Sequence, residues 1–120
     1  MARATGIGGV FFRARDPDAL RAWYVEQLGL PLEHGTVVLR PAGGALVWSP
    51  FREDTDYFGP GSQQSMVNYR VDDLDALLER LRAAGAEVDE RVVEEEYGRF
   101  AWAVDPEGNR FEMWEPAEGS

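Results

Sequence analysis

The stretch GVFFRARDPDAL, residues 9–20, returns 57 positions further along the chain as MVNYRVDDLDAL, residues 66–77. Val, Arg, Asp, Asp, Ala and Leu occupy the same places in both copies. A stretch of this length that recurs at a fixed spacing indicates two copies of one supersecondary unit. The fold therefore follows from what one copy forms and from how two copies combine.

The first copy predicts a strand followed by a helix. An alternation of period two marks a strand with two different faces, one carrying Val10, Phe12 and Ala14 and the other Gly9, Phe11 and Arg13. Asp16 can cap a helix that has Pro17 at its first position and ends at Gly29. Along that helix the apolar side chains at helical spacing are Leu20, Trp23, Tyr24 and Leu28.

The second copy repeats this order. Its strand alternates Val67, Tyr69 and Val71 with Met66, Asn68 and Arg70, and its helix has Leu74, Leu77, Leu78 and Leu81 on one face. Asp72 or Asp73 can cap this helix, and Gly85 follows it. Short β-type runs joined by the turn signals PAGG and DPEGN follow the two helices. Each half therefore reads as β-α-β-β-β.

A four-stranded sheet with one helix has one uncovered face, so two such modules gain by packing together. We predict an α+β fold in which two tandem β-α-β-β-β modules form a cup-shaped mixed sheet with the helices outside. The chain of 120 residues is expected to be a single domain with module 1 at about 6–58, a linker at about 59–65 and module 2 at about 66–116.

The charge and the amino-acid composition of the chain exclude some classes of binding partner. The net charge is −10, and an acidic surface repels phosphate backbones and anionic lipid headgroups, so neither nucleic acid nor a membrane is expected as a partner. There is no cysteine, no apolar run typical of a signal peptide and none long enough to span a bilayer. A cytoplasmic location is expected.

The chain resembles the vicinal oxygen chelate (VOC) superfamily, which holds glyoxalase I, extradiol dioxygenases, and the bleomycin and fosfomycin resistance proteins. The resemblance extends from Gly9 to Trp114 and rests on three motifs: VFFRARDPDALRAWYVEQLGL, VDDLDALLERLRAAGAEV and DPEGNRFEMWE. It implies a glyoxalase-like fold with the ligand site inside the cup, and it implies a homodimer, because relatives commonly pair or swap modules.

The resemblance also implies where a metal would be held in the metal-dependent members. The first-strand positions correspond to Gly9 and Met66, and only Glu112 matches a carboxylate on a last strand. The single histidine, His34, falls in a loop. Because catalytic metal sites need about three protein ligands, no metal ligands and no cofactor are expected.

Glu112 is the candidate catalytic residue. If Arg13, Asn68 and Arg70 also face the cup, two readings are open: a structural salt bridge between Glu112 and one arginine, or a general base beside an anion clamp. The expected substrate-binding residues are Phe11, Arg13, Trp48, Tyr57, Met66, Asn68, Arg70, Tyr97, Arg99 and Trp114. Among them Tyr97 and Arg99 flank Gly98 and could form a gate at the mouth of the cup, whereas Phe100 and Trp102 could pack behind a helix.

The functional hypothesis is a glyoxalase/bleomycin resistance protein/dioxygenase-like protein that binds a small organic molecule in the cup without a catalytic metal. Whether it is an enzyme stays open at this point. One alternative is a lyase, isomerase or epimerase that uses Glu112 as a general base. A further alternative is a metal-dependent glyoxalase or dioxygenase.

Overall fold

The computed structural model describes residues 1–118, which form two helices and one mixed sheet. The elements in chain order are β1 (Ala4–Ala14), α1 (Pro17–Leu28), β2 (Leu32–Glu33), β3 (Thr36–Leu39), β4 (Leu46–Arg52), β5 (Ser65–Val71), α2 (Leu74–Ala83), β6 (Glu87–Val88), β7 (Val93–Glu95), β8 (Gly98–Val104) and β9 (Arg110–Pro116). In the described part of the chain, no helix is long and apolar enough to cross a membrane.

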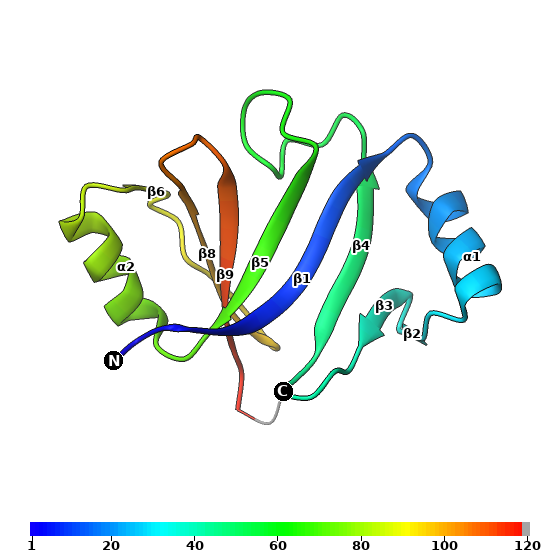
Figure 1. Ribbon diagram of the computed structural model, residues 1–120, viewed down its shortest axis with the longest axis horizontal. Helices are drawn as coiled ribbons and strands as arrows, with labels where there is room; N and C mark the ends of the chain where they lie inside the picture. The colour runs from blue at the N-terminus through cyan, green and yellow to red at the C-terminus, as the bar shows by residue number, and fades with distance from the viewer. Residues whose placement is uncertain (119–120) are drawn as a thin grey trace.

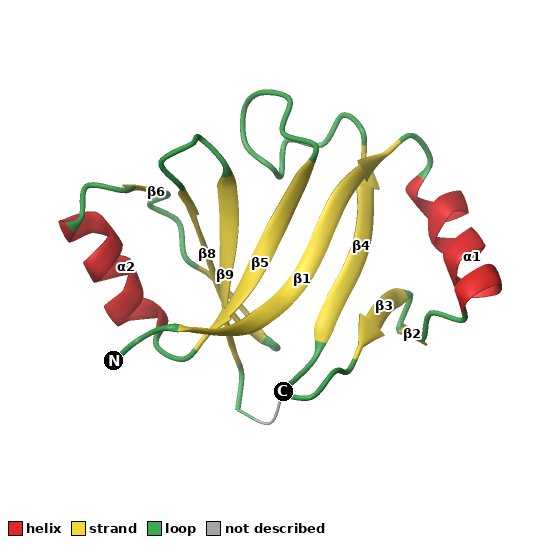
Figure 2. Ribbon diagram, viewed as in Figure 1, coloured by secondary structure: helices red, strands yellow, loops and turns green. Residues whose placement is uncertain are grey.

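The sheet has the order β2-β3-β4-β1-β5-β9-β8-β6, with β7 paired to β8. The two halves meet where β1 runs antiparallel to β5, and each of these strands has a parallel neighbour from its own half, β4 and β9. The sheet curls, with α1 and α2 at its opposite sides (Figures 1 and 2). The predicted fold class is confirmed, although the second half has one more short strand than expected, because β6 and β7 pair with different parts of β8.

The helices begin and end as the sequence predicts. Asp16 and Asp73 each accept a hydrogen bond from the backbone N–H three residues further on, which satisfies one of the free donors of the first turn. Gly29 ends α1 in the left-handed conformation, with φ of 66°. These local signals mark the bounds of both helices, and at the start of α2 the backbone N–H of Leu74 also donates to Glu115 of β9.

The two faces of the sheet bury different clusters. Between α2 and the convex face of the sheet, the buried residues are Val71, Leu74, Leu78, Ala101, Ala103 and Met113. On the concave face the buried residues are Phe11, Phe58, Met66 and Trp102. Phe58 belongs to the loop 53–64 that joins the halves, so this loop covers part of the cup.

Glycines on β1 admit large side chains to the concave face. A Cβ atom on Gly8 would lie 2.3 Å from Asn68 Oδ1 and 2.8 Å from Trp114 Cε3. Likewise, a Cβ on Gly6 would lie 3.0 Å from Arg70 Nη1. The run GIGG therefore provides the space into which β5 and β9 direct their side chains.

Candidate functional site

Glu112 lies in the middle of β9 and points to the concave face. Its register partners are Asn68 on β5 and Trp102 on β8. Since residues that pair across strands share a face, these three side chains meet on the floor of the cup. Asn68 comes from the first strand of the second half, and Trp102 and Glu112 come from its last two strands.

Three donors converge on the Glu112 carboxyl group. Asn68 Nδ2 donates to Oε1 at 2.5 Å, Trp102 Nε1 donates to Oε2 at 2.8 Å, and the Tyr57 hydroxyl also donates to Oε2. Glu112 is only 1% exposed and forms no ion pair within residues 1–118. The interpretation of Glu112 as the partner of Arg13 or Arg70 in a salt bridge is therefore wrong.

Burial raises the pKa of Glu112, because the charged form loses the solvation it has in water. The hydrogen bonds from Tyr57, Asn68 and Trp102 oppose this effect, as does the charge of Arg110. Burial and the nearby Glu112 carboxylate together raise the pKa of Tyr57, so its hydroxyl stays protonated and acts as a donor. The site thus holds a carboxyl group that is neutral over a wider pH range than an exposed glutamate.

The loop 53–64 brings Tyr57 to this carboxyl group. The Tyr57 ring stacks on Phe51, with 5.3 Å between the ring centroids, and meets Trp102 edge-on at 6.0 Å. The next residue, Phe58, is 1% exposed and packs with Phe11 and Met66. Of the expected binding residues, Phe11, Tyr57, Met66 and Asn68 are therefore brought together around Glu112.

Asn68 has one atom without a partner. Its Oδ1 is buried and accepts no hydrogen bond from the described residues, and it faces Gly8. If the Asn68 amide group rotated by half a turn, Oδ1 and Nδ2 would exchange places. A protonated Glu112 could then donate a hydrogen bond to Oδ1. The pair can therefore accommodate either protonation state of the carboxyl group.

The two arginines expected to clamp an anion bind the protein backbone instead. Arg13 donates to the carbonyl oxygens of Glu53, Thr55 and Gln63. Arg70 donates to the carbonyl oxygens of Gly43 and Ala45. Both side chains lie on the concave face, as predicted, but their donors fix loops.

Two expected site residues lie elsewhere, which corrects the prediction. Trp48 packs on the convex face against Phe12 and Tyr24 of α1, since it pairs with the outward-facing Val10. Arg99 also points outward, where it forms an ion pair with Asp75 of α2 at 2.9 Å. The predicted gate is absent from this end of the described sheet, because Arg99 lies on the opposite face from the cup.

The other two aromatic candidates lie together. Trp114 is on the concave face as expected, and its ring stacks on Phe100 with 6.0 Å between centroids. Its Nε1 donates to the carbonyl oxygen of Tyr97 at 2.9 Å. The Tyr97 side chain is about half exposed, so it contributes to this end of the cup chiefly through its backbone.

Trp102 lies on the concave face beside Glu112, whereas the sequence pattern suggested that it could pack behind a helix. A usable signal exists, because β8 and β9 form a hairpin around DPEGN and residues equally far from Glu107 face each other. Glu112 and Trp102 are such a pair. The register of this hairpin therefore indicates that Trp102 lies on the same face as Glu112, which the number of aromatic residues in the sequence does not show.

The residues present do not fit the divalent metal that the resemblance associates with this fold. Gly9 and Met66 offer no hard oxygen or imidazole donor, and both oxygens of Glu112 already accept hydrogen bonds. Within the described residues, no group of three or more His, Cys, Asp and Glu side chains is placed to hold a metal ion. At the positions that the resemblance associates with metal ligands, these residues therefore offer a divalent ion only the carboxyl group of Glu112.

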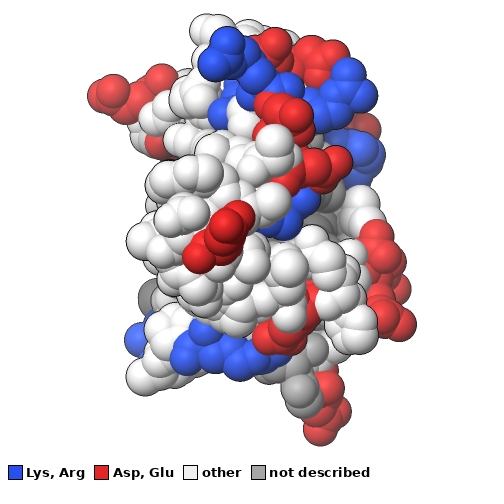
Figure 3. All heavy atoms as spheres, turned by 90° about the vertical axis from the view of Figure 1, so that its right-hand side faces the viewer, with Lys and Arg blue, Asp and Glu red and all other residues white. Residues whose placement is uncertain are grey.

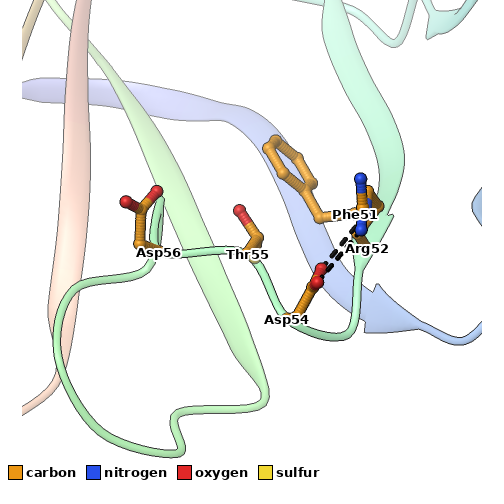
Figure 4. A pocket seen from close by; sticks show the side chains of 5 residues that line it. All are labelled: Phe51, Arg52, Asp54, Thr55 and Asp56. Carbon is orange, nitrogen blue, oxygen red and sulfur yellow. Dashed lines mark hydrogen bonds and ion pairs between the residues drawn. The ribbon is translucent and has the colours of Figure 1, made fainter.

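A surface depression of about 450 Å³ adjoins the site (Figure 4). Its lining residues are Phe51, Arg52, Asp54, Thr55 and Asp56. Figure 4 shows Arg52 paired with Asp54, with Phe51 extending from the end of β4 and Thr55 and Asp56 from the loop that follows. Since the Phe51 ring stacks on Tyr57, one aromatic side chain separates this depression from the residue that covers Glu112.

Comparison with solved structures defines the class of fold. Methylmalonyl-CoA epimerase from Mycobacterium tuberculosis is 27% identical, with a TM-score of 0.67, over 95% of this chain and 89% of that chain. The Streptomyces coelicolor methylmalonyl-CoA epimerase in complex with 2-nitronate-propionyl-CoA is 17% identical, with a TM-score of 0.76, over 96% and 99% of the two chains. A glyoxalase/bleomycin resistance protein/dioxygenase superfamily member from Vibrio splendidus 12B01 is 16% identical, with a TM-score of 0.60, over 96% and 99%.

The fold is thus that of the glyoxalase/bleomycin resistance protein/dioxygenase superfamily, as the resemblance implied. The chain belongs to the family of the Glyoxalase-like domain, whose sequence pattern matches residues 9–114. No curated protein matches the sequence.

Proposed function

We propose that the protein binds a small organic molecule on the concave face of the sheet, at the carboxyl group of Glu112, without a divalent metal. The observation that carries this proposal is a carboxyl group that is 1% exposed and accepts three hydrogen bonds but has no ion-pair partner within residues 1–118. Burying such a group costs stability unless it is fully paired. Perturbed carboxyl groups of this kind are concentrated at functional sites.

The surroundings indicate the chemistry of the ligand. Tyr57, Trp102 and Phe51 supply aromatic surface, which suits a flat apolar body. Arg13 and Arg70 are engaged by backbone carbonyl oxygens, so neither of these guanidinium groups is free to clamp an anion. We therefore favour a neutral or cationic ligand, in keeping with the net charge of −10.

The route to the carboxyl group passes Tyr57. Its hydroxyl occupies the place on Glu112 Oε2 where a ligand donor would bind, and its ring stacks on Phe51, which lines the depression. Rotation of Tyr57 together with a shift of the Phe51 ring would expose the carboxyl group to that depression. The ligand then replaces the Tyr57 hydrogen bond instead of filling an empty cavity.

A thermal-shift screen of small aromatic compounds, followed by calorimetry, tests this proposal. A ligand should raise the melting temperature of the wild-type protein, bind more tightly to Tyr57→Ala, and bind at least about 10-fold more weakly to Glu112→Ala. Glu115→Gln is a matched control, because Glu115 lies on the same strand but pairs with the outward-facing Arg99. Equal affinity for wild type and Glu112→Ala would place the ligand elsewhere.

The metal-free part of the proposal has its own test. The purified protein is loaded with Ni²⁺, Zn²⁺, Mn²⁺ and Fe²⁺, dialysed, and analysed for bound metal, with Glu112→Ala as the control. We expect far less than one equivalent of any metal. Stoichiometric metal that is lost in Glu112→Ala would restore a metal-dependent glyoxalase or dioxygenase as the function.

A second candidate is an enzyme that moves a proton next to a carbonyl group, as an isomerase, epimerase or lyase does. The raised pKa of Glu112 supports it, because an acid or base with a pKa nearer neutrality is more effective. The likeness to methylmalonyl-CoA epimerases supports it as well. In this case Glu112 exchanges a proton with the substrate, and Asn68 and Trp102 hold its carboxyl group in place.

Glu112→Gln separates the two candidates. A binding protein should keep its ligand affinity within about 10-fold, since the amide preserves the shape and one acceptor. An enzyme should retain affinity but lose at least about 100-fold in turnover. The readout for turnover is exchange of deuterium from solvent into the bound ligand, followed by NMR, because this exchange is detected whatever product the enzyme forms.

We also propose that the protein is cytoplasmic and that it forms a homodimer. The absence of cysteine is compatible with a reducing compartment, and large uncharged side chains remain exposed on α1 and β2. Sedimentation equilibrium of the full chain tests the oligomeric state. Fractionation of cells that express the tagged chain tests the location.

A further inference from the structure

Arg110 is the first residue of β9 and lies on the concave face, two residues before Glu112. Its register partner is Val104 on β8, and the alternation along this hairpin places Arg110, Glu112 and Trp114 on one face. The Arg110 side chain is only 16% exposed. An arginine is rarely buried to this extent unless its donors are used, so its contacts show what it holds in place.

One set of contacts joins Arg110 to the loop 53–64. Its Nε donates to the carbonyl oxygen of Tyr57 at 3.3 Å. Its side-chain stem packs on the backbone of Gly59, where an added Cβ atom would lie 2.9 Å from Arg110 Cδ. The side-chain amide of Gln63 pairs with the Arg110 backbone, donating to its carbonyl oxygen at 2.7 Å and accepting from its N–H at 2.8 Å. A single residue of β9 thus contacts both the middle and the end of this loop.

The other set of contacts joins the Arg110 guanidinium group to the floor of the cup. Its Cζ lies 5.4 Å from the centroid of the Trp102 ring, and both Nη atoms lie 3.5 Å from Asp89 Oδ2. Arg91 has the same two partners, with its Cζ 5.2 Å from the Trp102 ring and its Nη2 3.4 Å from Asp89 Oδ2. Among the described residues, however, Arg91 forms hydrogen bonds with Asp89 and none with the loop 53–64. Arg91 is therefore a matched control for the loop contacts of Arg110.

The charges on the outer side of the loop hold it less firmly. Three of its first four residues are acidic, and the ion pair between Arg52 and Asp54 is exposed. Figure 3 shows acidic and basic side chains gathered at the top of the molecule, the end at which this loop lies in Figure 1. Exposed ion pairs contribute little to stability. The less exposed contacts of the loop, with Arg13 and Arg110, therefore do most to hold it.

Tyr57 is thus attached to β9 at two points. Its hydroxyl donates to Glu112, and its carbonyl oxygen accepts from Arg110. The two attachments can break separately, because a side chain changes rotamer while its backbone stays in place. A ligand that takes the place of the hydroxyl on Glu112 therefore leaves the bond to Arg110 intact.

We infer that Arg110 is a positioning residue, which keeps the backbone of Tyr57 over the carboxyl group of Glu112 and so limits how often the site opens; this rests on the site proposed above. Arg110 acts through the Tyr57 backbone and the stem contact with Gly59. A hydrogen bond from a charged donor is stronger than one between neutral groups. Its loss should therefore increase the fraction of molecules in which the loop is lifted from the sheet.

The indole N–H of Trp102 reports this opening without any ligand. It is buried and donates to Glu112 Oε2, so its proton exchanges with solvent only when the site opens. The indole N–H of Trp114 donates to the carbonyl oxygen of Tyr97 at the other end of the cup and is the reference within the same molecule. NMR of the isotope-labelled full chain, at one fixed pH, follows both protons.

Arg110→Met should raise the exchange rate of the Trp102 N–H by at least about 10-fold and leave that of Trp114 within about 2-fold. Arg91→Met should change neither rate, since the loop contacts stay. Arg110→Lys keeps the charge and most of the stem but lacks the Nε donor. It is a milder variant should Arg110→Met fail to fold, and it should raise the Trp102 rate by a smaller factor.

Three results would overturn the inference. The first is an unchanged Trp102 rate in whichever Arg110 variants fold. The second is an equal rise for Trp102 and Trp114, which would show a general loss of stability. The third is the same rise in Arg91→Met, which would assign the effect to the contact with the Trp102 ring. None of these results depends on a ligand, so the binding proposal is judged separately by the compound screen with Glu112→Ala.

Discussion

The hydroxyl group of Tyr57 donates a hydrogen bond to the carboxyl group of Glu112, a residue 55 positions further along the chain. This contact joins the loop between the halves to the floor of the cup. It also covers the one buried carboxyl group found on the concave face of the described chain. The loop and the candidate site are therefore linked, and changes at either residue should be detected at the other.

Tyr57→Phe should destabilise the protein by about 1–2 kcal/mol, because a buried carboxyl group loses a donor while the ring is kept. Urea unfolding at pH 7 measures this change. Tyr69→Phe is the control, since the Tyr69 ring packs against Phe111 on the convex face and no hydrogen bond from its hydroxyl is found among the described residues. Equal effects of both variants would show that the Tyr57 hydroxyl is solvated in solution.

Glu112→Gln should become more stable relative to the wild type as the pH rises. The folded-state pKa of Glu112 is raised above its ordinary value of 4.5. The protonated Glu112 therefore contributes to the stability of the folded state below pH 4.5, and this contribution is lost as the pH rises through the folded pKa. Glutamine does not ionise and avoids this loss. Urea unfolding between pH 4 and 8 gives the difference curve; a flat curve would mean that Glu112 ionises as it does in the unfolded chain.

The acidic residues with lowered pKa values do not disturb that comparison. The pKa of Asp75 is lowered by its pairing with Arg99, and that of Asp89 by its hydrogen bonds to Arg91. These carboxylates stabilise the folded state at pH values above their pKa in the unfolded chain. This stabilisation is lost as the pH falls through their lower pKa in the folded protein. They are the same in both proteins, so their effects cancel in the difference.

Gly8→Ala should destabilise the fold by about 2–3 kcal/mol, because the added methyl group overlaps Asn68 and the Trp114 ring. Gly6→Ala on the same strand is the matched control. Its methyl group would meet only the far end of the flexible Arg70 side chain, which can move. Thermal unfolding of both variants provides the test, and a similar loss for the two would refute the tight packing on Gly8.

Arg13→Gln should loosen the loop 53–64 with little effect on the sheet. The guanidinium group of Arg13 donates to three backbone carbonyl oxygens of the segment that contains Tyr57. Amide hydrogen exchange should therefore rise by about 10-fold or more in residues 53–64 and stay unchanged in β8 and β9. Uniformly faster exchange would show that Arg13 supports the whole fold instead.

The sequence predicted most of the fold because its signals are local. The alternation on residues 9–14 and the capping by Asp16 and Asp73 depend on neighbours along the chain. Alternation shows which side chains of a strand share a face, but the partner strand must be known to decide which of the two faces lies toward the cup. That is why Trp48 and Trp102 were assigned to the wrong faces.

The site was predictable to the extent that it depends on strand position. Glu112 and Asn68 lie on paired strands, and both face the cup as predicted. The roles of Arg13 and Arg70 were not predictable, because their partners are carbonyl oxygens in loops whose paths the sequence does not specify. The approach of Tyr57 to Glu112 depends on the same loop geometry.

The central place of β1 affects how the chain is made. This first strand pairs with β4 and β5, so during synthesis it must wait until residues 46–52 and then 65–71 have left the ribosome. Until then its two edges offer unpaired backbone groups and apolar side chains, a state prone to aggregation. The nascent chain is thus most exposed to misfolding before its second half appears, and a chaperone that binds extended apolar segments would be most useful at that stage.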